Sequence, residues 1–149
     1  MGTLIRNQEQ YTAHIIVRSE LVNLFSYNDV KKGHIHQSMD VFLNREPNYD
    51  HDIHGPDMWA IKVIGINYED IGYINPSDAI HIAPIMDFIK LYGHDADVEA
   101  TISDTYDWTD LGLIFPIDIC FSCKEQLVQK ITKPLRKLGM DFDLYYKMY

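Results

Sequence analysis

The chain has 149 residues, of which 46% are hydrophobic and 23% are charged, a composition typical of one folded domain. Its formal net charge is −9, whereas proteins that bind nucleic acids usually carry an excess of Lys and Arg. No apolar run approaches the ~20 residues of a membrane helix, and the first residues lack the apolar segment of a signal peptide. Two cysteines are too few for a disulfide framework. We therefore expect a single domain over 1–149, cytoplasmic and with no membrane partner.

The first half of the chain has the pattern of β-strands. Branched and aromatic residues predict strands over 12–18, 39–43 and 59–66. The segment 67–70 then predicts a hairpin turn into a short strand over 71–74. Together these segments indicate an antiparallel meander.

Helix signals mark the middle of the chain. Asn75 precedes Pro76, and this pair predicts a helix start, because Asn caps the first turn and Pro fits its first position. Pro84 interrupts the apolar series that follows. We expect either a kinked helix or two pieces, a short turn ending near Ile82 and a second piece that Gly93 closes.

The last third of the chain predicts two strands and a helix. The strands cover 98–103 and 113–121, on either side of an acidic loop. Ser122 and Glu125 have the spacing of a capping box, and a helical apolar repeat then runs to Gly139. The predicted fold class is mostly β with two helical segments, an α+β barrel-like sheet.

Motifs in a fixed order connect these elements to a known family. They read L-x-R-E-P-N at 43–48, D-x-x-A-I-x-V at 57–63 and I-G-Y at 71–73, followed by FPIDICFSCKEQ at 115–126. In these motifs the chain resembles the HIRAN family, over roughly residues 30–144 and most strongly over 41–87 and 113–144. The resemblance implies a small modified OB-like or SH3-like β-barrel that binds DNA.

The resemblance also implies a binding pocket. In one member of the family, the pocket holds the 3′ end of a single DNA strand with an aromatic pair, an Asn and an Asp of the signature loop, and further aromatics. The present chain has Val30 and Lys31 in place of the pair, although Phe25 and Tyr27 lie close by, and its signature loop is longer over 49–55. The implied nucleic-acid contacts, with the cations Lys31 and Arg45 added, are Tyr27, Lys31, Arg45, Asn48, Asp57, Trp59 and Tyr73.

A second group of candidate contacts lies near the C-terminus. Lys130, Lys133 and Lys137 fall on one face of the last predicted helix, nearly opposite its apolar residues. Such a stripe is either a solvated surface or a binding site for a phosphate backbone. We include all three lysines among the candidate DNA contacts.

Metal and redox chemistry are weaker interpretations. Cys120 and Cys123 form a C-x-x-C motif that the expected helix start would activate, but the motif lacks the partner pair of a zinc site. Four histidines are further ligand candidates: His34 and His36 would share a strand face, and His51 and His54 lie in one acidic loop. Buried cysteines and a solvated loop explain the same residues, and we expect no metal and no other cofactor.

We therefore expect a nucleic-acid-binding module for single-stranded DNA or 3′ DNA ends, in DNA repair or replication-fork processing, beside a partner helicase or nuclease. The alternative is a protein-interaction module that has lost the DNA pocket. Its acidic surface would be the segment 94–110, which carries six acids and no Lys or Arg. No Gly-rich phosphate loop, G-x-S-x-G or H-E-x-x-H motif occurs, so we expect no enzymatic activity.

Overall fold

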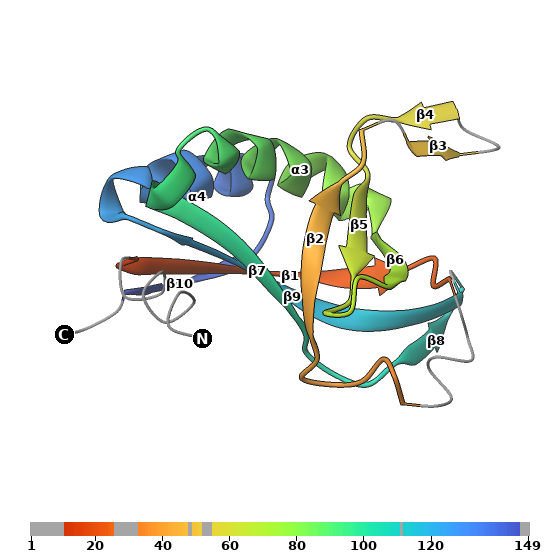
Figure 1. Ribbon diagram of the computed structural model, residues 1–149. Helices are drawn as coiled ribbons and strands as arrows, with labels where there is room; N and C mark the ends of the chain where they lie inside the picture. The colour runs from red at the N-terminus through yellow and green to blue at the C-terminus, as the bar shows by residue number, and fades with distance from the viewer. Residues whose placement is uncertain (1–10, 26–32, 48, 52–54, 111, 147–149) are drawn as a thin grey trace.

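A computed structural model describes residues 11–25, 33–47, 49–51, 55–110 and 112–146, with the backbone alone for 49–51 and 55–57. Its main sheet has eight strands in the order β10-β1-β6-β5-β2-β7-β9-β8, and the additional β1–β9 pairing closes the inner six into an antiparallel barrel (Figure 1). The barrel strands are β1 (Ala13–Val22), β2 (Asp40–Arg45), β5 (Ile61–Ile64), β6 (Asp70–Ile74), β7 (Ala96–Ile102) and β9 (Gly112–Cys123).

Three further pairings extend this barrel. β10 (Phe142–Tyr146) pairs with the first half of β1, and β8 (Asp107–Thr109) forms a short ribbon with the start of β9. β3 (Tyr49–His51) and β4 (Gly55–Asp57) form a separate hairpin that projects from the end of β2 (Figure 1). The predicted small OB-like barrel of mostly β structure is confirmed.

Buried and outward-facing residues alternate along β1, so one face of this strand lines the core of the barrel. Ala13, Ile15, Val17 and Leu21 are fully buried and Ser19 is buried too, whereas the residues that alternate with them face outward. The strand pairs with β9 from Ala13 to Leu21 and reaches β6 only at its last two residues. Such side chains, with those of β9 and α3, make one continuous hydrophobic core.

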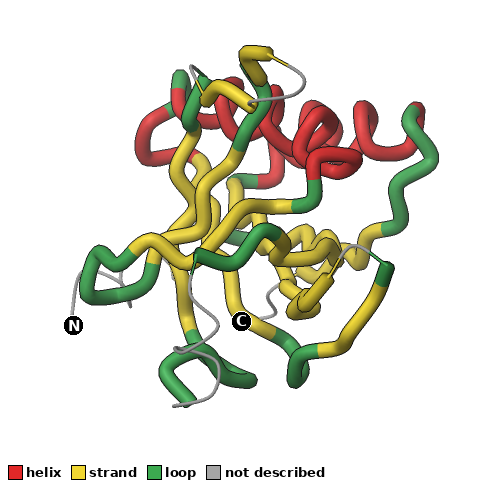
Figure 2. Tube along the Cα trace, turned by 90° about the vertical axis from the view of Figure 1, so that its right-hand side faces the viewer, coloured by secondary structure: helices red, strands yellow, loops and turns green. Residues whose placement is uncertain are grey.

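The two α-helices in the described part of the chain lie on one side of the barrel (Figure 2). α3 (Pro76–Lys90) begins where predicted, since the Asn75 side chain accepts a 3.0 Å hydrogen bond from the backbone N–H of Ser77. It also continues through Pro84, so the predicted division into two pieces is wrong. Pro84 is exposed, and the buried residues around it, such as Ala83 and Met86, hold both halves against the barrel.

The second helix differs more from the prediction. Ser122 lies in β9, where its hydroxyl is 2.8 Å from Nδ1 of His14 across the sheet, so it does not cap a helix. The chain then forms a short 3-10 turn, η2 (Glu125–Leu127), before α4 (Val128–Lys137). The predicted stop is confirmed, because Gly139 has φ 72°, a left-handed conformation suited to glycine. No helix of the described residues is long and apolar enough to cross a membrane.

The barrel is split between β2 and β7. These strands pair only at Asp40–Thr101 and Val41–Ala100. β2 continues to Arg45, and β7 starts at Ala96, four residues before its first residue paired with β2. α3 crosses above the split, and the 3-10 turn η1 (Gly93–Asp95) connects it to β7 (Figure 1). The end of β2 at this split carries the β3–β4 hairpin, and the gap between β2 and β7 forms a cleft.

Candidate nucleic-acid interface

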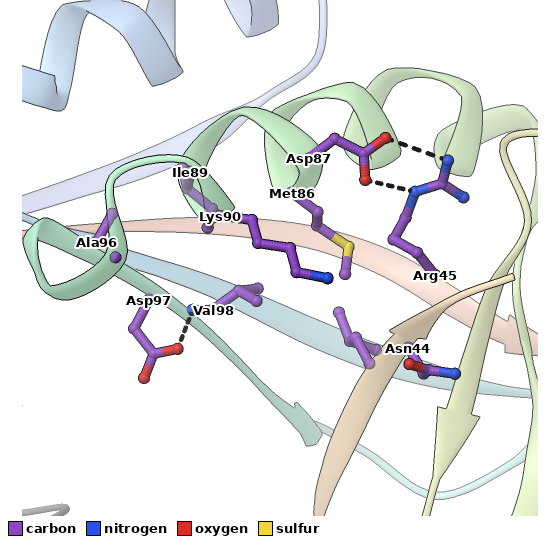
Figure 3. Close-up of a pocket in the computed structure, with 11 residues that line it drawn as sticks. Asn44, Arg45, Met86, Asp87, Ile89, Lys90, Ala96, Asp97 and Val98 are labelled. Carbon is purple, nitrogen blue, oxygen red and sulfur yellow. Dashed lines mark hydrogen bonds and ion pairs between the residues drawn. The ribbon is translucent and has the colours of Figure 1, made fainter. Parts of the chain in front are cut away.

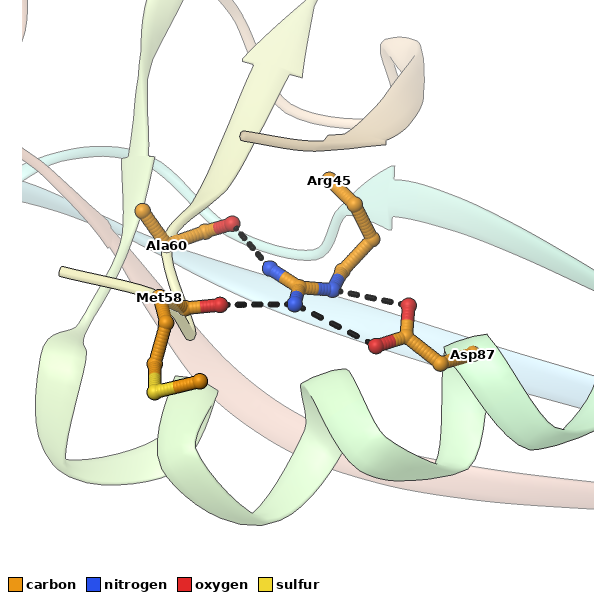
Figure 4. A network of polar contacts seen from close by, with 4 residues as sticks. All are labelled: Arg45, Met58, Ala60 and Asp87. Atoms are coloured by element: carbon orange, nitrogen blue, oxygen red, sulfur yellow. Dashed lines mark hydrogen bonds and ion pairs between the residues drawn. The ribbon is translucent and has the colours of Figure 1, made fainter. Parts of the chain in front are cut away.

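Arg45, the last residue of β2, connects three parts of the fold (Figure 4). Its guanidinium makes a bidentate ion pair with Asp87 of α3, with Nε–Oδ1 at 2.9 Å and Nη2–Oδ2 at 3.2 Å. Nη1 donates to the backbone carbonyl of Ala60 at 2.8 Å, and Nη2 also donates to that of Met58 at 2.7 Å. With 16% of its side chain exposed, Arg45 fixes the segment between β4 and β5 against the helix.

A polar chain continues from the next residue. Glu46 accepts a 2.6 Å hydrogen bond from the hydroxyl of Tyr73 and forms a 3.1 Å ion pair with Nζ of Lys62. Nζ of Lys62 also lies 3.6 Å from Oδ1 of Asp70. The pKa of Lys62 is raised, chiefly by its hydrogen bond to Glu46. The charge of Lys62, like that of Arg45, is therefore matched by neighbouring carboxylates.

Aromatic side chains lie beside this polar chain. The ring centroids of Phe25 and Tyr73 are 5.8 Å apart at an interplanar angle of 46°, and Trp59 packs 5.8 Å from the Arg45 guanidinium. Tyr73 is buried, whereas Phe25 is 54% exposed. Phe25 lies three residues after the end of β1, and its backbone N–H donates to the carbonyl of Ile71 at 3.0 Å. The exposed ring of Phe25 thus lies just after β1 and packs on the buried Tyr73 of β6.

The hairpin β3–β4 begins three residues after Glu46, at Tyr49. The backbone pairs Tyr49 with Asp57, and Glu46 donates its N–H to the carbonyl of Ala60 at 3.0 Å. The structure therefore brings Arg45, Trp59, Tyr73 and the backbone of Asp57 to one end of the barrel. Of the other predicted contacts, Tyr27, Lys31 and Asn48 lie outside the described residues, as does the side chain of Asp57.

Comparison with solved structures identifies this arrangement. The crystal structure of the HIRAN domain of human HLTF superimposes with a TM-score of 0.64 at 25% identity, over 89% of this chain and 97% of that domain. The NMR structure of the HLTF HIRAN domain in its DNA-bound conformation gives 0.61 at 23% identity, over 90% and 96%. The chain has the HIRAN fold. A protein from Lactobacillus plantarum shares it at a TM-score of 0.51 and 18% identity, over 72% of this chain and 95% of that protein.

No family model and no curated protein matches the sequence. The predicted resemblance to the HIRAN family is nevertheless confirmed, because it appears in three dimensions across nearly the whole chain. Phe25 is the residue of this HIRAN fold that sequence motifs did not assign. The signal for it was its place a few residues before Val30 and Lys31, which stand where the family has its aromatic pair.

The predicted lysine stripe lies elsewhere on the HIRAN fold. Lys130, Lys133 and Lys137 are exposed on α4, and Nζ of Lys130 is 6.0 Å from the ring of Phe88 near the end of α3. The Phe25–Tyr73 pair lies near the start of α3, about 20 Å from Phe88 along the helix axis at 1.5 Å of rise per residue. Arg45 lies at the other end of the interface, because its partner Asp87 directly precedes Phe88 on α3.

The metal and redox candidates do not form a site in the described residues. Cys120 and Cys123 are three residues apart on β9, so their side chains point to opposite faces, and burial raises the pKa of both thiols, that of Cys123 to about 11. The predicted activated thiol at a helix start is therefore wrong. His34 and His36 lie in a loop before β2, not on a strand, while the side chains of His51 and His54 are outside the description. Within the described part, no three ligating side chains gather around a metal position.

Proposed function

We propose that the chain is a DNA-binding module that holds a single strand by its end. The observation that carries this proposal is the HIRAN fold, shared over 90% of the chain with an HLTF domain in its DNA-bound conformation. The exposed ring of Phe25 against Tyr73 supports it, because bases stack on such rings with ~1–3 kcal/mol each.

The proposed interface needs a fixed hairpin. The guanidinium of Arg45 donates hydrogen bonds both to the carbonyls of Met58 and Ala60 and to the carboxylate of Asp87. Residues just before these carbonyls include Asp57, which the family resemblance implies at the terminal sugar. In this proposal Arg45 positions the loop, and its contribution to phosphate binding is small.

The proposal assigns the end preference to Asp57. A carboxylate repels a phosphodiester, so it favours binding only where the strand ends and a 3′-hydroxyl donates a hydrogen bond. Asp57→Ala should weaken binding to a 3′-hydroxyl strand by about 1–3 kcal/mol, the cost of one hydrogen bond to a charged group. Binding to a 3′-phosphorylated strand should be unchanged or tighter.

Fluorescence anisotropy tests the proposal with short strands that carry either 3′ end, at low and physiological salt. Absence of binding at high micromolar protein and low salt would overturn DNA binding. Equal losses for the two ends in Asp57→Ala would overturn end recognition and leave a general single-strand binder. The setting in DNA repair or fork processing, with a helicase or nuclease partner, belongs to the proposal and is tested by co-purification.

A second candidate function rests on the ribbon of β8 and β9. Tyr106 is 43% and Trp108 62% exposed, and Asp104, Asp107 and Asp110 alternate with them. Exposed aromatics among acids suit a basic segment of a partner protein. A pull-down that recovers nucleic acid and no protein would contradict this function, and so would a Trp108→Ala variant that keeps every partner.

A further inference from the structure

The split between β2 and β7 opens a cleft of about 430 Å³, within the ~300–1,000 Å³ of small-molecule sites (Figure 3). Its walls come from the end of β2, the second half of α3, and the start of β7. Leu43, Met86, Ile89 and Val98 supply apolar surface, and Met86 and Ile89 are buried in the core. Core packing therefore fixes the walls without a ligand.

The carboxylates around the cleft have hydrogen-bonding partners in the described structure, whereas the ammonium of Lys90 does not. Asp87 is neutralised by Arg45, and Asp97 directs Oδ1 to the backbone N–H of Val98 at 2.8 Å. Figure 3 shows the Lys90 side chain extended into the cleft past Met86, with its ammonium toward β2. Within the residues that the structure describes, Nζ of Lys90 has neither an ion pair nor a hydrogen-bond acceptor.

We propose that this cleft binds an organic monocarboxylate with an apolar body. The carboxylate lies at Nζ of Lys90, where it forms a charge-assisted hydrogen bond, and the body contacts the apolar walls. A single uncommitted cation suits a single negative charge. A dianion such as a phosphate monoester is disfavoured, because the carboxylates of Asp87 and Asp97 lie on the same lining.

The cleft differs from the DNA interface in position and chemistry. The Arg45–Asp87 ion pair belongs to both: it lines the cleft, and the same guanidinium holds the hairpin carbonyls of Met58 and Ala60 (Figure 4). Lys90 and the apolar walls belong to the cleft alone. Failure of DNA binding therefore leaves this proposal intact, and its own test requires no DNA. The competing explanation is that Lys90 only stabilises the C-terminal dipole of α3, in whose last turn it lies.

Titration of the isotope-labelled full chain with 4-phenylbutyrate, followed by amide chemical shifts, tests the proposal. Saturable shifts should concentrate at cleft residues such as Leu43 and Val98. Lys90→Met should weaken binding about tenfold, the effect of one lost charge-assisted hydrogen bond, and Lys90→Arg should retain most of it. The matched control Lys130→Met removes an exposed lysine outside the cleft and should leave the affinity unchanged.

The uncharged analogue 4-phenylbutanol provides the second arm. It should bind more weakly than the acid, and with the same affinity to the wild type and to Lys90→Met. Several results would overturn the proposal: no saturable shift at millimolar 4-phenylbutyrate, shifts that cluster away from the cleft, or equal affinity of acid and alcohol. Equal affinity of wild type and Lys90→Met, with a lower melting temperature of the variant, would show the helix-dipole role instead.

Discussion

The Asp87→Asn substitution distinguishes the two roles that Arg45 can have. If Arg45 is an anchor, loss of the carboxylate loosens the hairpin that the guanidinium holds. If Arg45 binds a DNA phosphate, loss of the same carboxylate frees a cation and strengthens binding. The two interpretations therefore predict opposite changes in affinity from one substitution.

The geometry sets the size of the expected effect. Asp87 is 50% exposed, so Asp87→Asn should lower the free energy of unfolding by about 1 kcal/mol, the upper end for an exposed pair with bidentate contacts. Arg45→Met also removes the donors to two backbone carbonyls. Water replaces the donor at exposed Met58, and Glu46 still donates to Ala60, so we expect a total of about 2–3 kcal/mol.

Urea unfolding measures these stabilities, and anisotropy at several salt concentrations measures DNA binding. Asp143→Asn is the matched control, since it removes the same charge from the Arg18–Asp143 ion pair on β1 and β10. We expect Asp87→Asn to bind DNA more weakly than this control with an unchanged salt slope. Tighter binding with a slope steeper by about 0.7, the value for one additional phosphate contact on a single strand, would refute the anchor role.

Three further predictions follow from the same region and from the core. Phe25→Ala should weaken binding of a short single strand by ~1–3 kcal/mol, the contribution of one stacked base, whereas Tyr68→Ala, which removes an 85% exposed aromatic from the β5–β6 turn, should have no effect in the same anisotropy assay. Tyr73→Phe removes the 2.6 Å hydrogen bond to a carboxylate and should lower the free energy of unfolding in urea by about 1.5–3 kcal/mol; an unchanged midpoint would contradict this. Burial raises the pKa of the Cys123 thiol from 9.0 to about 11, so the unfolded chain releases this proton before the folded state does. The free energy of unfolding should therefore decline between these pH values, and the decline should be smaller in Cys123→Ala.

Local patterns predicted the elements whose causes are local. The Asn75-Pro76 start of α3 and the Gly139 end of α4 depend on backbone conformations that these residue types favour, and both were predictable from a few neighbours. Ser122 had the same kind of local signal, but nine backbone pairs between β1 and β9 hold it in a strand. Tertiary pairing overrides a capping preference of about 1 kcal/mol.

The site was predictable only in part, because its partners are distant in the chain. The signature motif marked Arg45 as a cation, but its ion-pair partner lies 42 residues away on a helix. The same applies to Tyr73, whose carboxylate partner is 27 residues away. The cleft depends on where β2 and β7 separate, which is a property of sheet register and has no signature in either strand.

The distribution of charge decides how this protein can hold DNA. The cations of the candidate interface, Arg45 and Lys62, are matched by carboxylates, so a strand bound there displaces few counterions and its affinity should depend weakly on salt. The three lysines on α4 are exposed and about 20 Å from the Phe25–Tyr73 pair along α3, within reach of a strand of about 15 nucleotides stacked on Phe25 but not of a strand of about 4. Replacement of all three by Gln should therefore leave the short strand unaffected and reduce the salt slope of the long strand by about 2, at ~0.7 for each phosphate contact. An equal change for both lengths would place the lysines inside the primary interface, and no change for either would make them solvated surface.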